Sequence, residues 1–206
     1  MTRKSTTGAR SLKRRLKGIL TRDFITTASV IAIGLALMAG AAKPMDLQGT
    51  AWQRAAERHP QIDAFMLYAI ALIESGRTDQ QGHLRPWPWA LNVEGKPYFP
   101  ATKQDALDLL SSHAGKSIDL GLLQVNTRWH GHRVAALPAL LEPEINIEIG
   151  AAVLDEALSS APGDLTTGIG RYHSSQPRRG RRYARHVLTL YQHLMHANEK
   201  QEERHD

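Results

Sequence analysis

The feature that most limits how this chain can fold is a run of apolar residues at helical spacing between residues 62 and 73. Six of them recur at intervals of i, i+3, i+4, i+7, i+8 and i+11: Ile62, Phe65, Met66, Ala69, Ile70 and Ile73. This spacing lays one apolar stripe along a helix, and Gly76 is expected to end that helix. The rest of the chain must then supply elements that cover the stripe.

Most of the other signals along the chain are also helical. Pro60 stops a first short helix, Thr102 and Asp105 have the spacing of a capping box, and Pro143 stands at a first-turn position. A further helix begins near Asp164. Besides the apolar helix, we therefore predict helices over residues 50–59, 102–113, 143–160, from 164 onward, and over 180–197.

The stretch from residue 85 to 100 breaks this pattern. Its four prolines exclude a helix, and residues 89–93 meet residues 96–99 across Glu94-Gly95, which predicts a small hairpin or an extended flap. The expected fold is therefore mainly α with a small β-hairpin flap. Residues 43–198 would form one domain, and residues 199–206 a charged tail that frays.

Residues 1–42 have the pattern of a segment that directs export. A basic stretch ends at Arg22, no charge follows between Asp23 and Lys43, and the apolar run 24–38 leads into Ala39-Gly40-Ala41. A cleaved export signal has these features. The uncharged span is also close to the ~20 residues of a membrane-spanning helix, so an uncleaved N-terminal anchor stays open. Either way we expect the domain to be exported to the periplasm, with membrane contact only through residues 24–42 if the segment is retained.

Charge and cysteine content narrow the possible functions. Eight of the 26 Lys and Arg residues, but only one of the 20 acids, lie in residues 1–42. The remaining 18 basic and 19 acidic side chains give the domain a net charge of −1, so we expect no nucleic-acid partner. The absence of cysteine excludes disulfides, thiol catalysis and cysteine metal sites.

Glu74 is the first candidate for a catalytic residue. It directly follows Ile73 at the end of the apolar helix. A carboxyl held against an apolar wall resists ionisation, and a general acid that must hold its proton near neutral pH needs that environment. A solvated glutamate at a helix end is the ordinary alternative.

Four short blocks give Glu74 a context. They are Glu74-Ser75-Gly76, Gly121-Leu122-Leu123-Gln124-Val125-Asn126, Asn146-Ile147 with Gly150-Ala151 and Leu154, and Arg171-Tyr172-His173. In order and spacing the blocks resemble the transglycosylase SLT family, lytic transglycosylases with a fold like that of goose-type lysozyme. The run from Pro86 to Gly95 is similar to an insertion in the branch that serves conjugation, pilus and secretion machines.

The resemblance implies roles for individual residues. Glu74 would be the catalytic acid and base, and Ser75 and Gln124 would orient the glutamate and the sugar. Asn126, Tyr172 and His173 would also line the substrate site, with Tyr172 facing the carboxylate. Two positions depart from the family's Ala-Tyr-Asn motif, since Arg171 replaces the alanine and His173 the asparagine.

The resemblance also implies the reaction. Hydrolytic glycosidases pair two carboxylates, and no motif block contains a second acid, although Asp63, Asp79, Glu94 and Asp119 are present. The family uses one glutamate twice, first to protonate the glycosidic oxygen and then to take the proton of the muramyl C6 hydroxyl as it closes on C1. The expected partner is the glycan strand of peptidoglycan, with a secretion, conjugation or pilus apparatus as a further possible partner.

Three alternatives stay open. A second carboxylate would make the protein a hydrolytic lysozyme, and a chain without catalysis would be a wall-binding subunit of a secretion apparatus. Trp87, Trp89 and Trp129 could stack on sugars or pack in the core. His130 and His132 lack a further ligand at metal spacing, so we expect no metal site and no cofactor. The cluster Arg178, Arg179, Arg181, Arg182 and Arg185 is either a solvated face or a contact for anionic peptide stems or a partner.

Overall fold

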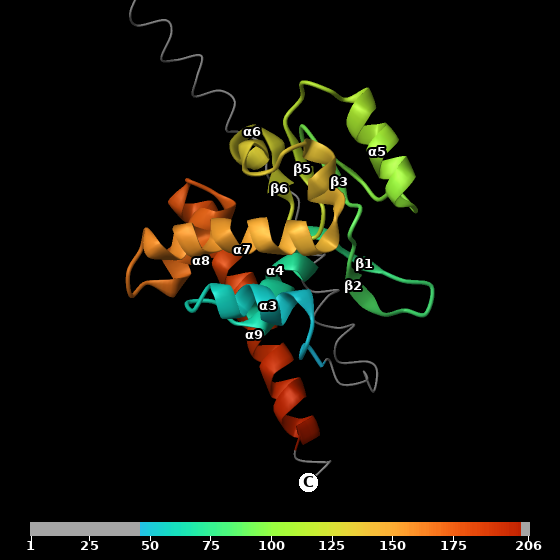
Figure 1. Cartoon of the computed structure of the whole chain (residues 1–206). Coiled ribbons are helices and arrows are strands. Elements are labelled where there is room, and N and C mark those ends of the chain that lie inside the picture. The colour runs from blue at the N-terminus through green and yellow to red at the C-terminus, as the bar shows by residue number, and fades with distance from the viewer. Residues whose placement is uncertain (1–45, 203–206) are drawn as a thin grey trace, which may run out of the picture.

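The computed structural model of the protein describes residues 46–202, which form a mainly helical fold with two small antiparallel sheets (Figure 1). This confirms the predicted mainly α class. In Figure 1, α4 runs through the middle, between helices α3, α7, α8 and α9 and the strands with α5. The α-helices are α3 (Ala51–Arg58), α4 (Ala64–Ser75), α5 (Lys103–Ser112), α6 (Thr127–His130), α7 (Pro143–Ser159), α8 (Leu165–His173) and α9 (Pro177–Glu202).

The two sheets are both antiparallel, and the larger one contains the predicted hairpin. Its order is β4-β3-β5-β6, and β3 and β4 join at Glu94 and Gly95, whose positive φ angles of 48° and 105° make the tight turn. We did not predict the other two strands of this sheet or the separate pair β1–β2. The strands are β1 (Gly76–Thr78), β2 (Leu84–Pro86), β3 (Leu91–Val93), β4 (Lys96–Tyr98), β5 (Ile118–Leu120) and β6 (Val125–Asn126).

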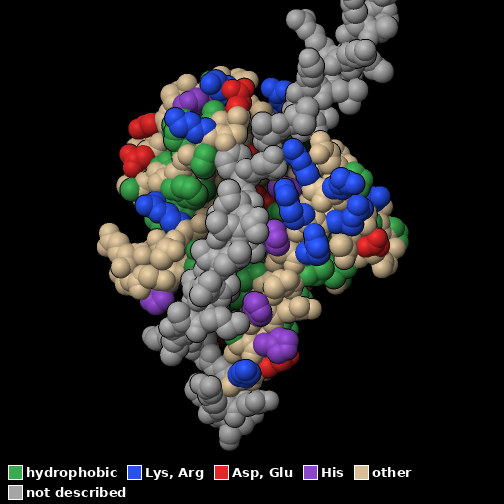
Figure 2. Space-filling view, turned by 180° about the vertical axis from the view of Figure 1, so that it is seen from behind, with side chains coloured by type: hydrophobic (Ala, Val, Ile, Leu, Met, Phe, Trp, Pro, Cys, Tyr) green, Lys and Arg blue, Asp and Glu red, His purple; other side chains and the backbone are tan. Residues whose placement is uncertain are grey.

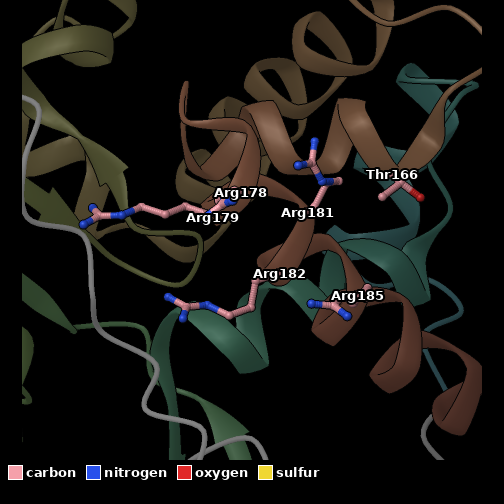
Figure 3. A pocket seen from close by; sticks show the side chains of 6 residues that line it. All are labelled: Thr166, Arg178, Arg179, Arg181, Arg182 and Arg185. Carbon is pink, nitrogen blue, oxygen red and sulfur yellow. The ribbon is translucent and has the colours of Figure 1, made fainter.

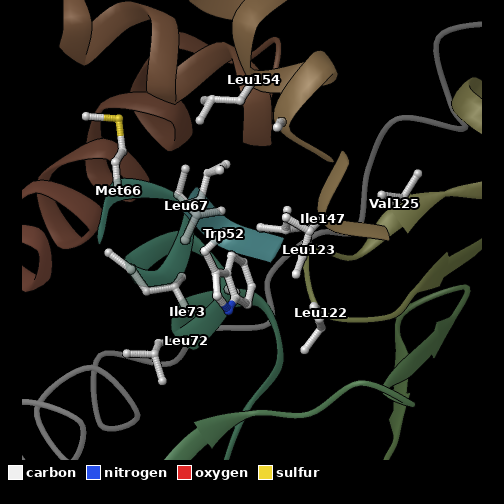
Figure 4. Close-up of a cluster of buried hydrophobic side chains, with 14 of the residues drawn as sticks. Trp52, Met66, Leu67, Leu72, Ile73, Leu122, Leu123, Val125, Ile147 and Leu154 are labelled. Atoms are coloured by element: carbon white, nitrogen blue, oxygen red, sulfur yellow. The ribbon is translucent and has the colours of Figure 1, made fainter. Parts of the chain in front are cut away.

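Helix α4 is buried on nearly all sides (Figure 4). The predicted stripe is buried from Met66 to Ile73, but so are Leu67, Ala71 and Leu72 between its members. The prediction of a single stripe was too narrow, because α3, α9 and the β1–β2 pair all contact this helix. Each fully buried Leu or Ile contributes about 1.5–3 kcal/mol relative to an exposed one.

Gly76 ends α4 for a reason that differs from the usual glycine cap. Its φ of −57° is not left-handed, so any residue could adopt the backbone conformation. A Cβ at this position would lie 2.1 Å from the carbonyl oxygen of Leu72, however. Glycine is therefore required by space, because the chain leaves the helix close against its own last turn.

The local rules for helix starts hold at three sites. Thr102 and Asp105 form the predicted capping box of α5, Pro143 opens α7, and Asp164 caps α8 through the backbone N–H of Thr167. Each start depends on neighbours in the sequence alone, which is why the sequence predicts it well.

Helix α9 is longer than predicted at both ends. It begins at Pro177 instead of residue 180, and it continues to Glu202 where we predicted a frayed tail from residue 199. Gly180 lies within the helix, where it contacts Gly170 of α8. A Cβ on Gly180 would lie 2.9 Å from the carbonyl oxygen of Gly170. The glycine thus allows two helices to approach, and it was misread as a helix boundary.

Three short elements and the N-terminal segment differ from the rest in how they compare with the prediction. The short helix α6 and the 3₁₀ turns η2 (Gly131–Arg133) and η3 (Leu137–Leu141) had no counterpart in the prediction. The predicted export segment, residues 1–42, lies outside the described residues. Between residues 46 and 202, no helix is both long and apolar enough to cross a bilayer.

Candidate functional site

The turn at residues 121–124, between β5 and β6, is where the four sequence blocks meet. Gly121 and Gln124 both have left-handed backbone, with φ angles of 76° and 46°. At Gln124, which has a side chain, this conformation costs energy and persists only where surrounding contacts impose it. Side chains from the other three blocks supply such contacts.

Ser75 ties the end of α4 to this turn. Its hydroxyl lies 2.7 Å from the carbonyl oxygen of Leu122 and 3.1 Å from that of Ala71. The hydroxyl oxygen in turn accepts a hydrogen bond from the backbone N–H of Trp87, at 3.3 Å. The side chain of Ser75 is thus occupied by backbone groups, and it positions Glu74 by fixing where α4 ends.

Asn146, at the start of α7, ties a third block to the turn. It is 1% exposed, accepts from the backbone N–H of Leu123 at 2.8 Å, and donates to the carbonyl oxygens of Leu120 and Leu140, both at 2.8 Å. A Cβ on Gly121 would lie 2.4 Å from the side-chain amide nitrogen of Asn146. We did not name Asn146 as a site residue, although its block was one of the four.

Tyr172 supplies the contact from the fourth block. Its hydroxyl donates to the carbonyl oxygen of Leu123 at 2.7 Å. Gln124 closes the turn on itself, since its side-chain amide donates to the carbonyl oxygens of Gly121 at 2.9 Å and Ala90 at 3.2 Å. Both residues therefore shape the turn, and their predicted contacts with a sugar stay predictions.

Asn126 also makes contacts within the fold. Its side-chain oxygen caps α6 by accepting from the backbone N–H groups of Arg128 and Trp129. Its amide donates to Asp119 at 2.7 Å and to Ser117 at 3.1 Å. This holds the last strand of the larger sheet against its neighbour.

Glu74 and His173 come together from helices that are far apart in the sequence. The Nδ1 atom of His173, the last residue of α8, lies 3.8 Å from Oε1 of Glu74 in the last turn of α4. The side chain of His173 is 12% exposed and that of Glu74 is 10% exposed. The imidazole stacks on the ring of Tyr183 of α9, with centroids 4.2 Å apart and planes at 4°. At this distance, which is longer than a hydrogen bond, the two groups interact through their charges.

The four other acids considered as catalytic partners have separate roles or positions. Asp63 caps the opposite end of α4, about 16 Å from Glu74 at 1.5 Å per residue. It also accepts a hydrogen bond from Tyr191, and burial together with this contact raises the pKa of that phenol to about 12. Asp79 caps the loop between β1 and β2, where backbone N–H groups lower its pKa. Glu94 is exposed in the hairpin turn, and only Asp119, on β5, is buried.

The tryptophans and histidines without an assigned role differ in how far they are exposed. Trp87 and Trp89 are partly buried and meet edge to face, and the guanidinium of Arg77 lies 4.9 Å from the ring centre of Trp87. Trp129 is 63% exposed and can meet a ligand. Within residues 46–202, no group of three His, Asp or Glu side chains has the arrangement of a metal site, His130 and His132 included.

Comparison of the chain with protein-family models, with curated proteins and with solved structures finds no match.

Proposed function

We propose that this protein is a lytic transglycosylase with a lysozyme-like fold, which cuts the bond between N-acetylmuramic acid and N-acetylglucosamine in peptidoglycan. The observation that carries this proposal is the Glu74 carboxyl, nine-tenths buried at the end of an apolar helix and beside His173. The contacts of Ser75, Asn146 and Tyr172 with one turn support it, because they explain why all four blocks are needed to build one site.

In the proposed reaction Glu74 acts twice. It first gives its proton to the glycosidic oxygen, and the bond from that oxygen to C1 breaks. The resulting carboxylate then takes the proton of the C6 hydroxyl of the same sugar as O6 bonds to C1. The proton returns to Glu74, no water is consumed, and the strand ends in 1,6-anhydromuramic acid. Intramolecular attack gives the C6 hydroxyl a large effective concentration over solvent.

The surroundings of the other acids favour this single-carboxylate reaction. Asp63 lies at the far end of α4, Asp79 lies in a loop, and Glu94 lies in an exposed turn. Asp119 supports the second candidate, a hydrolytic lysozyme, because it is buried two residues before Gly121. The two reactions give different products, since hydrolysis leaves a reducing muramic acid.

The setting of the reaction is part of the proposal. Export to the periplasm is supported by the basic and then apolar pattern of residues 1–42. Service to a conjugation, pilus or secretion apparatus is supported by the run Pro86–Gly95, which forms the end of β2, the connection to β3, the strand β3 and the turn to β4.

The test is a digest of purified sacculi followed by mass spectrometry of the soluble products. We expect fragments with 1,6-anhydromuramic ends, about 18 Da lighter than their hydrolysed equivalents. Glu74→Gln keeps the shape and removes the transferable proton, so it should lower turnover at least ~100-fold with an unchanged circular dichroism spectrum. Reducing ends would favour the lysozyme, and binding without release by both proteins would favour a wall-binding subunit.

A further inference from the structure

A hollow of about 750 Å³ lies over the first turns of α9, and its lining is unusually basic. It is bordered by Thr166 of α8 and by five arginines: Arg178, Arg179, Arg181, Arg182 and Arg185 (Figure 3). We call this the arginine pocket. Figure 2 shows blue basic side chains gathered at the right of the face opposite to that of Figure 1.

The spacing of these arginines follows from the burial of α9. Tyr183, Val187, Leu190 and Leu194 face the core, so Arg178, Arg181 and Arg185, at intervals of three and four residues, share another side of the helix. Like charges at these intervals repel one another, and cations are unfavourable near a helix N-terminus. The fold thus gains nothing from placing Arg178, Arg181 and Arg185 on one side of the helix, which points to a partner that brings negative charge.

Three of the arginines in the pocket, Arg178, Arg181 and Arg185, have charges that no nearby acid within residues 46–202 balances. Among the described residues, no carboxylate lies within ion-pair distance of Arg178, Arg181 or Arg185. The pKa of His186, also on α9, is lowered by burial and then by the charges of Arg182 and Arg185. The surface of this helix therefore has a positive local potential.

The positive charge is local and not a property of the whole domain. Residues 46–202 contain 16 basic and 17 acidic side chains, and five of the 16 lie between residues 178 and 185. A duplex nucleic acid or a membrane surface would need a wider basic face. Figure 3 shows the guanidinium groups spread along the helix and not converging on one point. This arrangement suits a ligand that carries several separate carboxylates.

The arginine pocket is also connected to the proposed catalytic carboxyl. Arg182 directly precedes Tyr183, whose ring supports His173, and His173 lies 3.8 Å from Glu74. The same turns of α9 thus support the site with one face and carry the arginines on another.

We propose that the arginine pocket binds the carboxylates of the peptide stems attached to the glycan strand, so that the protein prefers strands that carry their stems. This inference rests on the proposed function. Each stem presents carboxylates at intervals along the strand, and a guanidinium can bind a carboxylate through two parallel hydrogen bonds. The pocket thereby adds a second contact with the polymer, away from the bond that is cut.

The test uses two substrates that differ only in the stems: intact sacculi, and glycan strands from which an amidase has removed the stems. The variant is R178Q/R181Q/R185Q, which keeps long polar side chains and removes three charges. The control is R85Q/K96Q/K116Q, which removes three charges from the strands and the loop before β5. Because the three arginines repel one another, the variant should melt no lower than the wild type.

We expect the pocket variant to cut intact sacculi about tenfold more slowly or worse, as expected for loss of several charge-assisted contacts. It should cut stripped strands at the wild-type rate, and the control should match the wild type on both. Equal losses on both substrates, or no loss, would overturn the proposal. So would arginine-dependent binding of duplex DNA or of vesicles rich in phosphatidylglycerol that is as tight as binding to sacculi.

A binding measurement separates this proposal from the proposed function. Co-sedimentation of the Glu74→Gln protein with intact and stripped strands reports stem binding without any cleavage. Arginine-dependent preference for intact sacculi, together with no cleavage by the wild type, would sustain the pocket and refute the enzyme. Cleavage of both substrates without such a preference would support the enzyme and refute the role of the pocket.

Discussion

His173 and Glu74, 99 positions apart in the sequence, hold an imidazole nitrogen and a carboxylate oxygen 3.8 Å apart in a site that is nine-tenths closed to solvent. Histidine side chains change charge between about pH 5 and 8. A protonated imidazole in this position favours the ionised carboxylate. Any charge on His173 would therefore act directly on the carboxyl that gives up its proton in the proposed reaction.

The first prediction follows from this contact and concerns His173→Asn. Asparagine cannot carry a charge, so the ratio of kcat/KM between variant and wild type should exceed one several-fold at pH 5–6, where free imidazoles are mostly charged. At pH 8, where most imidazoles are neutral, the ratio should approach one or fall below it. Initial rates on sacculi from pH 5 to 8 give this ratio.

Tyr183→Phe is the control for this prediction, because it keeps the ring that stacks on His173. Its pH profile should follow that of the wild type. A ratio between His173→Asn and wild type that does not change with pH would show that His173 acts only by its shape.

The contact between Glu74 and His173 also marks the limit of what the sequence could predict. The starts of α5, α7 and α8 depend on Thr102, Pro143 and Asp164, whose effect extends over one turn of chain, and all three predictions are confirmed. The approach of His173 to Glu74 depends on how α8 and α9 pack around α4, which no local spacing encodes. The strands β5 and β6 were missed because they are three and two residues long, and because β5 pairs with β3, which lies before α5 in the sequence.

For the site residues, too, the sequence predicted the segments better than the contacts of each side chain. The blocks indicated which segments matter, but the structure assigns several of their side chains to the backbone of the turn. Ser75, Gln124 and Asn126 were expected to meet substrate, and each makes hydrogen bonds to groups of the fold. Asn146 hydrogen-bonds three backbone groups, one in the turn and two beside it, and only its place in a block pointed to it.

The second prediction concerns Asn146→Ala. Removing this buried amide leaves the N–H of Leu123 and the carbonyl groups of Leu120 and Leu140 without their bonds. Each such group costs about 1–3 kcal/mol, so the free energy of unfolding should fall by about 3–5 kcal/mol. Urea titration followed by circular dichroism measures it.

Asn92→Ala is the matched control, since Asn92 is also buried but its side chain accepts one hydrogen bond, from the N–H of Gly95. It should cost only about 1 kcal/mol. Equal losses for the two variants would mean that Asn146 does not hold the turn.

The third prediction uses the pair Tyr191 and Asp63. The folded protein raises the pKa of Tyr191 to about 12 through burial and the 2.6 Å hydrogen bond to Asp63. The unfolded phenol titrates near its ordinary pKa of about 10. The stabilising effect is therefore complete below pH 10 and is lost as the pH rises toward 12.

Tyr191→Phe removes this dependence. The difference in free energy of unfolding between wild type and variant should be constant below pH 9 and shrink between pH 10 and 12. Urea midpoints for both proteins across this range give the difference, in which the titration of other groups cancels. A difference that stays constant to pH 12 would contradict the role of this hydrogen bond in holding the phenol neutral.

The last prediction concerns Asp119 and decides between the two enzymes. Asp119 is 7% exposed on β5 and accepts a hydrogen bond from the side-chain amide of Asn126. If Glu74 acts alone, Asp119 serves the sheet, and Asp119→Asn keeps an oxygen that can accept the same bond while it removes the charge. Cleavage of sacculi should then stay within a few-fold of the wild type, and the products should still end in 1,6-anhydromuramic acid.

If Asp119 instead activates water or attacks the sugar, the same change removes an essential group and activity should fall at least ~100-fold. Mass spectrometry of the digests reads both the rate and the product, and a strong loss, with reducing ends in the wild-type digest, would make the protein a hydrolase with two carboxylates.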